Sequence, residues 1–155
     1  VLHGRFPYLS YPRKYTSRDR EIAYSAMEQV GIADFAEKPL FMLSGGMRQN
    51  AYIAMALAQD TDYILLDEPT TYLDIAHQLE LMRILRKLAD SGKGIVTVMH
   101  NLPIAFDFSD KLTVMSNGKI IAYGTPSEIC ESHIVEDIFG VKIKQVQKGK
   151  YLYEY

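Results

Sequence analysis

Two short apolar segments flank one long amphipathic segment in the middle of the chain, and this order restricts the possible folds more than any other feature. Residues 63–66 predict one strand, and residues 94–99 predict a second. The second alternates little between polar and apolar side chains, which is typical of a strand buried on both faces of a sheet. Between them, Asp74 precedes a helix with apolar residues at positions i, i+3, i+4 and i+7, and Gly92 ends it. Strand, helix and strand in this order predict a parallel pair joined by a crossover helix.

The first third of the chain is predicted to be irregular at its start and then almost entirely helical. Ser17 or Asp19 can cap one helix, and Gly31 can end it. Ser44 can cap a second helix that runs to about Gln59. The inward face of this second helix is predicted to carry Ile53, Ala54, Leu57 and Ala58.

The last third of the chain is predicted to consist of short elements. Residues 112–115 and 119–123 flank the sequence Ser-Asn-Gly, which is a strong hairpin signal. Pro126 is expected to open a short helix. Residues 141–146 and 151–155 predict another strand pair at the end of the chain.

The composition limits the classes of protein to which the chain can belong. The 155 residues are 48% hydrophobic and 23% charged, which indicates one globular domain rather than a disordered chain. The net charge of −2 argues against bulk attraction to nucleic acid or to an anionic membrane. The single cysteine, Cys130, excludes an internal disulfide and is typical of a reducing compartment. The longest apolar stretch, residues 51–58, is too short to span a bilayer.

Three side chains that suit catalysis follow the two predicted strands. Asp67 and Glu68 end the first strand, and His100 follows the second. Ligands of an open parallel sheet bind beyond the carboxyl ends of its strands, so we expect these side chains along one edge. Because neighbouring strand residues point to opposite sides, one acid is expected to hold Mg²⁺ and the other to orient or deprotonate a water molecule. The alternative interpretation is a solvated acidic turn before Pro69.

A second candidate site lies at the start of the second helix and consists of Ser44, Gly45 and Gly46. A helix N-terminus offers free N–H groups and the positive end of a dipole, and glycine lets a phosphate approach the backbone closely. The alternative is a simple N-cap. Met47 stands at the third helical position and cannot accept a hydrogen bond, so we expect no capping box here.

The remaining histidines and the cysteine are assigned no chemistry. His3, His77 and His133 are interpreted as structural, since no group of histidines and cysteines has the spacing of a metal site. Cys130 has no evident partner for nucleophilic chemistry and is assigned to a helix face.

Four segments occur in the order and rough spacing of motifs found in ATP-binding cassette (ABC) ATPases. Residues 43–46 resemble the signature, residues 63–70 the Walker B motif, residues 71–74 the D-loop and residues 99–102 the H-loop. The resemblance covers nearly the whole chain. It implies an α/β fold, made of a partial P-loop NTPase (RecA-like) core with a parallel sheet and a helical signature subdomain.

The resemblance also implies a division of the chain by function. Residues 1–60 would form the helical signature subdomain, and residues 61–125 the second half of the RecA-like core. Residues 126–155 would form a C-terminal extension of helix and strand.

Roles for single residues follow from the same resemblance. Asp67 would bind Mg²⁺ through water, Glu68 would be the general base for ATP hydrolysis, and His100 would contact the γ-phosphate. The family works as a head-to-tail dimer of two ATPase subunits with two ATP molecules at the interface. Residues that would act on the ATP held by the other subunit, or couple the two sites, are Ser44, Gly45, Gly46 and Asp74.

A finer resemblance concerns the group within the family. Residues 4–8, residues 70–78 and residues 139–141 look like those of importers of iron chelates, haem and cobalamin. In that group the ATPase lies at the cytoplasmic face of the cell membrane under a transmembrane permease, whose coupling helix docks on the helical subdomain.

The chain departs from the family pattern in two respects. The 155 residues contain no G-x-x-x-x-G-K-[ST] loop, so we expect that the chain alone, as a fragment, does not hydrolyse ATP. Met47 and Asn50 replace the Gln and the basic residue that usually follow the signature glycines. Two alternatives stay open: a non-catalytic docking module for a permease or a P-loop-bearing partner, and an ABC-type ATPase of DNA repair or chromosomes. The near-neutral charge argues against the latter, and no nucleic acid is expected as a partner.

Overall fold

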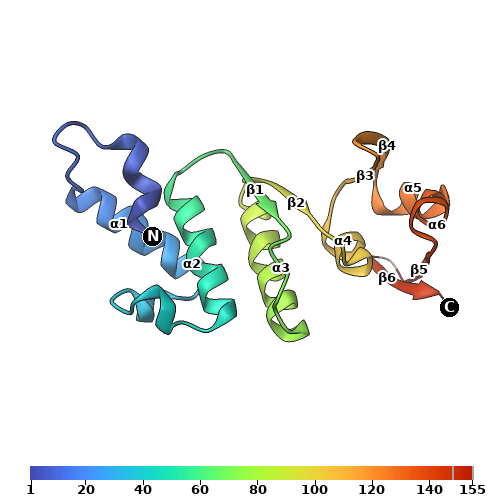
Figure 1. The fold of residues 1–155 in the computed structure, drawn as a ribbon, viewed down its shortest axis with the longest axis horizontal. Coiled ribbons are helices and arrows are strands. Elements are labelled where there is room, and N and C mark those ends of the chain that lie inside the picture. Colours follow the sequence, from blue (N-terminus) through green and yellow to red (C-terminus); the bar gives the residue numbers. More distant parts are fainter. Residues whose placement is uncertain (148, 155) are drawn as a thin grey trace. The chain divides into compact units, whose positions relative to one another are not determined.

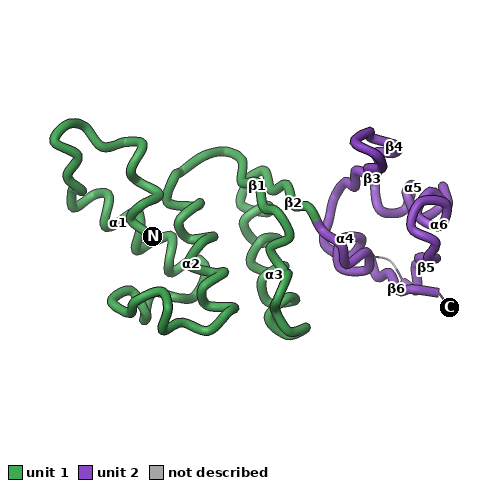
Figure 2. Tube along the Cα trace, in the orientation of Figure 1, with its two compact units in different colours: residues 1–98 green, residues 99–155 purple. Residues whose placement is uncertain are grey.

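The computed structural model describes residues 1–147 and 149–154. The chain forms two compact units, unit 1 (Val1–Val98) and unit 2 (Met99–Tyr155), which Figure 2 draws in different colours. The predicted α/β class is confirmed, because helices alternate with strands and one pair of strands is parallel. The division of the chain into three functional segments stays a prediction.

Unit 1 begins with a helical region. Its elements are the 3₁₀ helix η1 (Leu2–Tyr8), α1 (Ser17–Gln29), the 3₁₀ turns η2 (Ala33–Phe35) and η3 (Leu40–Met42), and α2 (Gly45–Ala58). Helices α1 and α2 pack against each other, and η1 packs against both (Figure 1). The prediction of an irregular start is wrong for η1, because residues 2–8 form a 3₁₀ helix. Within η1, Gly4 lies so close to the carbonyl of Met55 that any side chain there would clash. The four residues predicted to face inward from α2 are all buried.

Local hydrogen bonds set the two ends of α1. Thr16 caps the N-terminus: its hydroxyl accepts the N–H of Asp19 (3.2 Å), and Asp19 Oδ2 accepts the N–H of Thr16 (2.9 Å). The predicted cap at Ser17 or Asp19 is therefore wrong, because Asp19 takes the reciprocal place in a capping box. Gly31 has a φ of +72° and ends the helix as predicted.

A buried ion pair ties η1 to both helices. Arg5 Nε lies 3.2 Å from Asp19 Oδ1, and Arg5 Nη1 donates to the carbonyl of Ala58 (2.9 Å) at the end of α2. The backbone N–H and the hydroxyl of Thr16 hold the pKa of Asp19 below its ordinary value, and Arg5 lowers that pKa further. The carboxylate that joins the three helices is therefore stabilised in its charged form.

The second part of unit 1 is a strand–helix–strand unit. It contains β1 (Tyr63–Asp67), α3 (Ile75–Asp90) and β2 (Gly94–Val98). The two strands pair in parallel along their whole length, as predicted. Helix α3 packs against β2, and its buried face carries Leu81, Met82, Leu85 and Leu88.

One face of the β1–β2 pair is exposed. Its side chains and their exposed fractions are Tyr63 (68%), Leu65 (76%), Val96 (55%) and Val98 (53%). The opposite face includes Ile64, which is only 4% exposed. The prediction that both faces of the second strand are buried is therefore wrong, because Val96 and Val98 lie on the uncovered face. We call these four residues the open sheet face.

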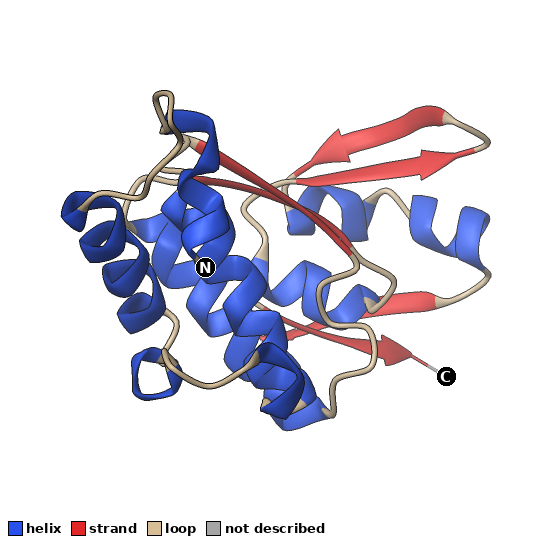
Figure 3. Ribbon diagram, turned by 60° about the vertical axis from the view of Figure 1, so that its left-hand side comes forward, coloured by secondary structure: helices blue, strands red, loops and turns tan. Residues whose placement is uncertain are grey.

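Unit 2 consists of short helices and two antiparallel strand pairs. Its elements are α4 (Leu102–Phe108), β3 (Leu112–Ser116), β4 (Lys119–Gly124), α5 (Pro126–Glu131), α6 (Ile134–Phe139), β5 (Lys142–Gln147) and β6 (Lys150–Glu154), which Figure 3 colours by type. Both strand pairs and the helix at Pro126 are confirmed, whereas α4 and α6 are not foreseen from the sequence. The last residue of the predicted tail strand, Tyr155, lies outside the described residues.

The hairpin and the core of unit 2 have plain physical causes. Asn117 and Gly118, between β3 and β4, have φ angles of +50° and +72°, which a two-residue hairpin turn requires. The core is formed by one cluster of buried side chains, Phe106, Val114, Ile129, Val135 and Tyr151. Within the residues that the structure describes, no helix is long and apolar enough to cross a membrane.

Candidate functional site

The turn after β1 holds Glu68 in an unusual backbone conformation. Strand β1 ends at Asp67, and the N–H of Glu68 donates to the carbonyl of Val98 (3.0 Å) at the end of β2. Glu68 then has a φ of +46°, a left-handed conformation that side chains other than glycine adopt at a cost of roughly 1–3 kcal/mol. Strain of this kind concentrates at functional sites. The turn, rather than alternation along one strand, separates the exposed Asp67 from the half-buried Glu68.

Hydrogen bonds fix the Glu68 carboxylate and the segment that follows it. The hydroxyl of Thr71 donates to Glu68 Oε2 (3.0 Å), and the N–H of Thr71 donates to the carbonyl of Glu68 (3.1 Å). Gln78 Nε2, near the start of α3, donates to the carbonyls of Leu73 (2.9 Å) and Thr70 (3.3 Å). These hydrogen bonds fix the backbone of the loop between Glu68 and α3. The carboxylate therefore has a defined position before any ligand arrives.

The signature residues stand at the N-terminus of α2, as predicted. The hydroxyl of Ser44 caps the helix and accepts the N–H of Met47 (3.3 Å). The N–H groups of Gly45 and Gly46 belong to the first turn, where a helix offers no acceptor of its own. A side chain added at Gly45 would meet no atom within 4 Å, so the backbone is open to an approaching group there. Asn50, one of the two departures from the family pattern, donates to the carbonyl of Val30 (3.1 Å) and ties α2 to the end of α1.

The N-terminus of α3 contacts the N-terminus of α2. Asp74 caps α3: its Oδ1 accepts a hydrogen bond from the backbone N–H of His77 (2.9 Å), and its Oδ2 is hydrogen-bonded to ring Nδ1 of His77 (2.7 Å). These two hydrogen bonds hold the pKa of Asp74 below its ordinary value. A Cβ on Gly46 would lie 2.6 Å from Cδ2 of His77, so the imidazole ring occupies the space that a side chain at Gly46 would need. The sequence interpretation of His77 as merely structural missed this contact. The Asp-x-x-His spacing at a helix start could have indicated the hydrogen bond between Asp74 and His77, but not the contact of His77 with Gly46.

The predicted site residues fall into both units. Asp67, Glu68, Asp74 and the signature residues lie in unit 1. There, Glu68 is hydrogen-bonded to Thr71, and Asp74 to His77. His100 is an exposed residue of unit 2, directly before Asn101, whose side chain caps α4 by accepting the N–H of Ile104 (3.3 Å). The placement of His100 beside the two acids stays a prediction.

Asp67 can serve a metal ion only together with other ligands. Among the described residues, no three of the types His, Cys, Asp and Glu gather closely enough to hold a metal ion. Mg²⁺ usually keeps several water molecules and binds through one or two carboxylates plus phosphate oxygens of a nucleotide. An exposed carboxylate at the end of a parallel strand, such as that of Asp67, fits this mode of binding.

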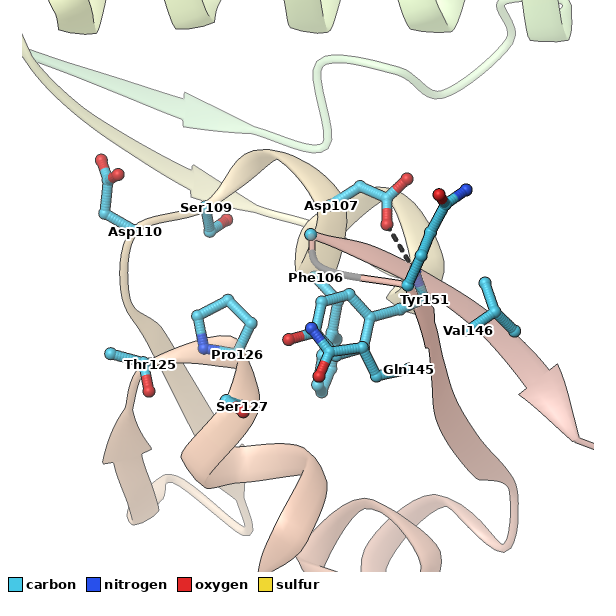
Figure 4. A pocket seen from close by; sticks show the side chains of 12 residues that line it. Phe106, Asp107, Ser109, Asp110, Thr125, Pro126, Ser127, Gln145, Val146 and Tyr151 are labelled. Atoms are coloured by element: carbon cyan, nitrogen blue, oxygen red, sulfur yellow. Dashed lines mark hydrogen bonds between the residues drawn. The ribbon is translucent and has the colours of Figure 1, made fainter.

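A pocket in unit 2 includes none of the predicted site residues. It has a volume of about 590 Å³, and Figure 4 shows Phe106 and Tyr151 beside polar side chains around it. Asp107 on its border accepts the N–H of Tyr151 (2.8 Å) and a proton of Lys150 Nζ (3.0 Å), so this carboxylate anchors β6 to α4. Cys130, on α5, donates to the carbonyl of Ile143 (3.2 Å), and burial raises its pKa. The hydrogen bonds of Asp107 and Cys130 thus connect neighbouring elements of unit 2.

Comparison with known proteins gives concordant results. Residues 5–71 match the family described as ABC transporter. The chain is 42% identical over 140 residues to the petrobactin import ATP-binding protein FpuD of Bacillus anthracis, a match of 90% of this chain and 51% of that protein. It is 44% identical over 142 residues to the iron(3+)-hydroxamate import ATP-binding protein FhuC of Bacillus subtilis, covering 91% and 53%. The chain therefore spans about half the length of the curated relatives it matches.

A solved structure gives the same result for the fold. A transporter described as a metal-chelate type ABC transporter, in an inward-facing conformation, matches with a TM-score of 0.86 and 27% identity. The match covers 99% of this chain and 64% of that one. The predicted partial P-loop NTPase core with a helical signature subdomain is thereby confirmed.

Proposed function

Because the chain belongs to the ABC transporter family of ATP-binding proteins, we propose that it is part of an ATPase that drives import of an iron chelate or a related nutrient. In this proposal, the chain supplies the signature, Walker B, D-loop and H-loop motifs of that ATPase. The observation that carries the proposal is Glu68, held in a left-handed turn at the end of β1 by its hydrogen bond with Thr71. The names of the relatives, which concern siderophore import, support an importer rather than an ATPase of DNA repair.

Each site residue has a role in this proposal. Glu68 acts as the general base that orients and deprotonates the attacking water, and Asp67 holds Mg²⁺ through water molecules. His100 contacts the γ-phosphate of the same ATP. The open helix N-terminus at Ser44, Gly45 and Gly46 binds the γ-phosphate of the ATP held by a second subunit, and Asp74 couples the two sites. Mg²⁺, when bound, neutralises charge on the phosphates.

The proposal includes the assembly in which the chain works. Two ATPase subunits associate head to tail, so that the signature of one subunit completes the ATP site of the other. The pair binds a transmembrane permease at the cytoplasmic face of the cell membrane, which makes the ATPase a peripheral subunit. The P-loop that cradles the phosphates belongs to a segment other than these 155 residues.

Nucleotide binding and turnover test the proposal. The purified chain is titrated with a fluorescent ATP analogue in the presence of Mg²⁺, alone and fused behind a P-loop-bearing first half of an ABC ATPase. We expect no binding by the chain alone up to about millimolar nucleotide, since a P-loop supplies most of the phosphate contacts. The fusion should hydrolyse ATP, and Glu68→Gln should lower its turnover by roughly 10²–10⁴-fold, the usual contribution of a general base.

Glu80→Gln is the matched control, because Glu80 is an exposed acid on α3, the helix that follows the Glu68 turn, and carries no proposed role. Its turnover should equal that of the unaltered fusion. A folded fusion that fails to hydrolyse ATP, or one that loses nothing on Glu68→Gln, would contradict the proposal. Hydrolysis by the chain alone, abolished by Glu68→Gln, would show that these residues recruit nucleotide without a P-loop.

A further inference from the structure

His77 contacts both of the segments that the proposed function uses, although no catalytic role falls to it. Through Nδ1 it hydrogen-bonds Asp74 Oδ2 (2.7 Å), the cap of α3. On its other side, the ring edge at Cδ2 lies where a side chain at Gly46 would have to stand. One imidazole ring therefore joins the D-loop segment (residues 71–74) to the signature segment (residues 43–46) within unit 1.

The contact continues from the D-loop segment to Glu68. The hydroxyl of Thr71 donates to Glu68 Oε2 (3.0 Å), and the backbone of this loop is held by Gln78, the neighbour of His77 on α3. A movement of the carboxylate thus displaces Thr71 and the loop, and the loop carries the cap that holds the imidazole. Chains of packed side chains and hydrogen bonds carry energetic coupling between sites when they have two discrete arrangements.

We propose that His77 is a positioning residue that couples the Glu68 turn to the signature glycines of the same subunit. The inference rests on the proposed function for its consequence: Glu68 would act on one ATP, and the signature of the same chain on the other. His77 would then transmit the state of one nucleotide site to the other. Gly46 has a second function in this arrangement, since its missing side chain makes room for the ring.

Two variants at His77 separate its two contacts. His77→Phe keeps a ring against Gly46 but loses the hydrogen bond with Asp74. His77→Asn keeps a short hydrogen-bond donor near Asp74 but loses the ring. A purely structural role for His77 as part of the helix cap would tolerate His77→Asn, whereas a positioning role requires both contacts together.

The test is a two-dimensional ¹H–¹⁵N NMR spectrum of the full chain without nucleotide. Glu68→Gln is introduced into the unaltered chain and into His77→Phe, His77→Asn and His77→Ala, and the amide resonance of Gly46 is followed. We expect Glu68→Gln to shift this resonance in the unaltered chain and to shift it much less in each of the three His77 variants. An equal shift in all backgrounds would overturn the proposal, because the effect would then reach Gly46 by another route.

The two glycines provide a matched control for the geometry. Gly46→Ala should displace the ring resonances of His77, while Gly45→Ala should leave them unchanged because a side chain at Gly45 meets no atom within 4 Å. Equal effects of the two substitutions would contradict the assigned contact.

These spectra need no ATP, so they separate this inference from the proposed function. A chain that shows the His77-dependent shift but forms no active fusion would retain the coupling and lose the proposed activity. An active fusion in which the shift of the Gly46 resonance does not depend on His77 would retain the proposed activity and contradict the coupling. Should His77→Ala fail to fold, His77→Phe and His77→Asn give the same answer.

Discussion

The helical region of unit 1 and its strand–helix–strand unit differ in how far they cover their apolar side chains. In the helical region, η1, α1 and α2 cover one another, and Ile53 and Ala54 are almost completely buried. In the strand–helix–strand unit, α3 covers only one face of β1 and β2, and the open sheet face keeps four large apolar side chains in solvent. Three mutually packed helices close a core, whereas two strands and one helix do not.

This difference shows where the stability of unit 1 resides. Burial of apolar surface is the main favourable term in folding, so residues of the helical core contribute much and residues of the open sheet face contribute little. An apolar face of this kind is also a surface on which another layer of protein can bind. The predictions below test the contrast, beginning with the largest expected effect.

Truncation of one side chain in each region gives the most direct comparison. Ile53→Ala should lower the free energy of unfolding by about 2–5 kcal/mol, because the side chain is only 1% exposed and its loss leaves a cavity. Leu65→Ala should change it by no more than about 0.5 kcal/mol, since Leu65 is 76% exposed. Urea denaturation followed by circular dichroism measures both. If Leu65→Ala were as costly as Ile53→Ala, the open sheet face would be buried in solution by self-association.

Removal of a helix cap should have a smaller effect in the helical region. Thr16→Ala removes the hydroxyl that accepts the N–H of Asp19 and should lower the free energy of unfolding by about 1 kcal/mol. Ser17→Ala is the control, because Ser17 follows the cap and makes no capping contact that stabilises α1. The same denaturation experiment compares them. Equal losses would show that the hydroxyl of Thr16 does not stabilise α1.

Acid should weaken the helical region through Asp19. Its pKa is lowered in the folded state, chiefly by the backbone N–H of Thr16, so its stabilising contribution is present above the ordinary value of 3.8 and is lost as the pH falls through the lowered pKa. The unaltered chain should therefore lose stability below pH 3.8, and Asp19→Asn should show less of that loss. Urea denaturation at neutral pH and at acid pH measures the difference. An identical pH dependence in both chains would contradict the role of Asp19.

The smallest effect is expected at the signature helix. Met47→Gln supplies the acceptor that the capping box of α2 lacks and should raise the free energy of unfolding by a few tenths of a kcal/mol. Met47→Leu is the control, because it preserves an apolar side chain of similar volume and adds no acceptor. Denaturation midpoints of the two variants decide the question. A Met47→Gln variant no more stable than Met47→Leu would show that Ser44 alone satisfies this helix end.

Features that depend on local chemistry could be predicted from the sequence. Asp74 and Ser44 cap their helices as predicted, and Asn117 and Gly118 form the expected hairpin turn, because each depends on residues close by in the chain. Helix α4 was missed, since its seven residues are too few to show a helical period. The exposure of the strands was also missed, because an apolar strand has the same sequence whether or not a second layer covers it.

The candidate site shows the same limit. Asp67, Glu68, Gly45 and Gly46 could be selected as candidates from their motifs. The contact of His77 with Gly46 could not, because the two residues lie far apart in sequence and meet only in the folded chain.

The left-handed backbone at Glu68 has a consequence for sequence selection. A glycine or an asparagine would adopt this conformation more readily, so the fold alone favours replacing the acid, by about 1 kcal/mol in the case of glycine. A library of variants selected only for resistance to heat should therefore drift away from glutamate at this position. Under the proposed function, the carboxylate at residue 68 would be a place where stability is given up for activity.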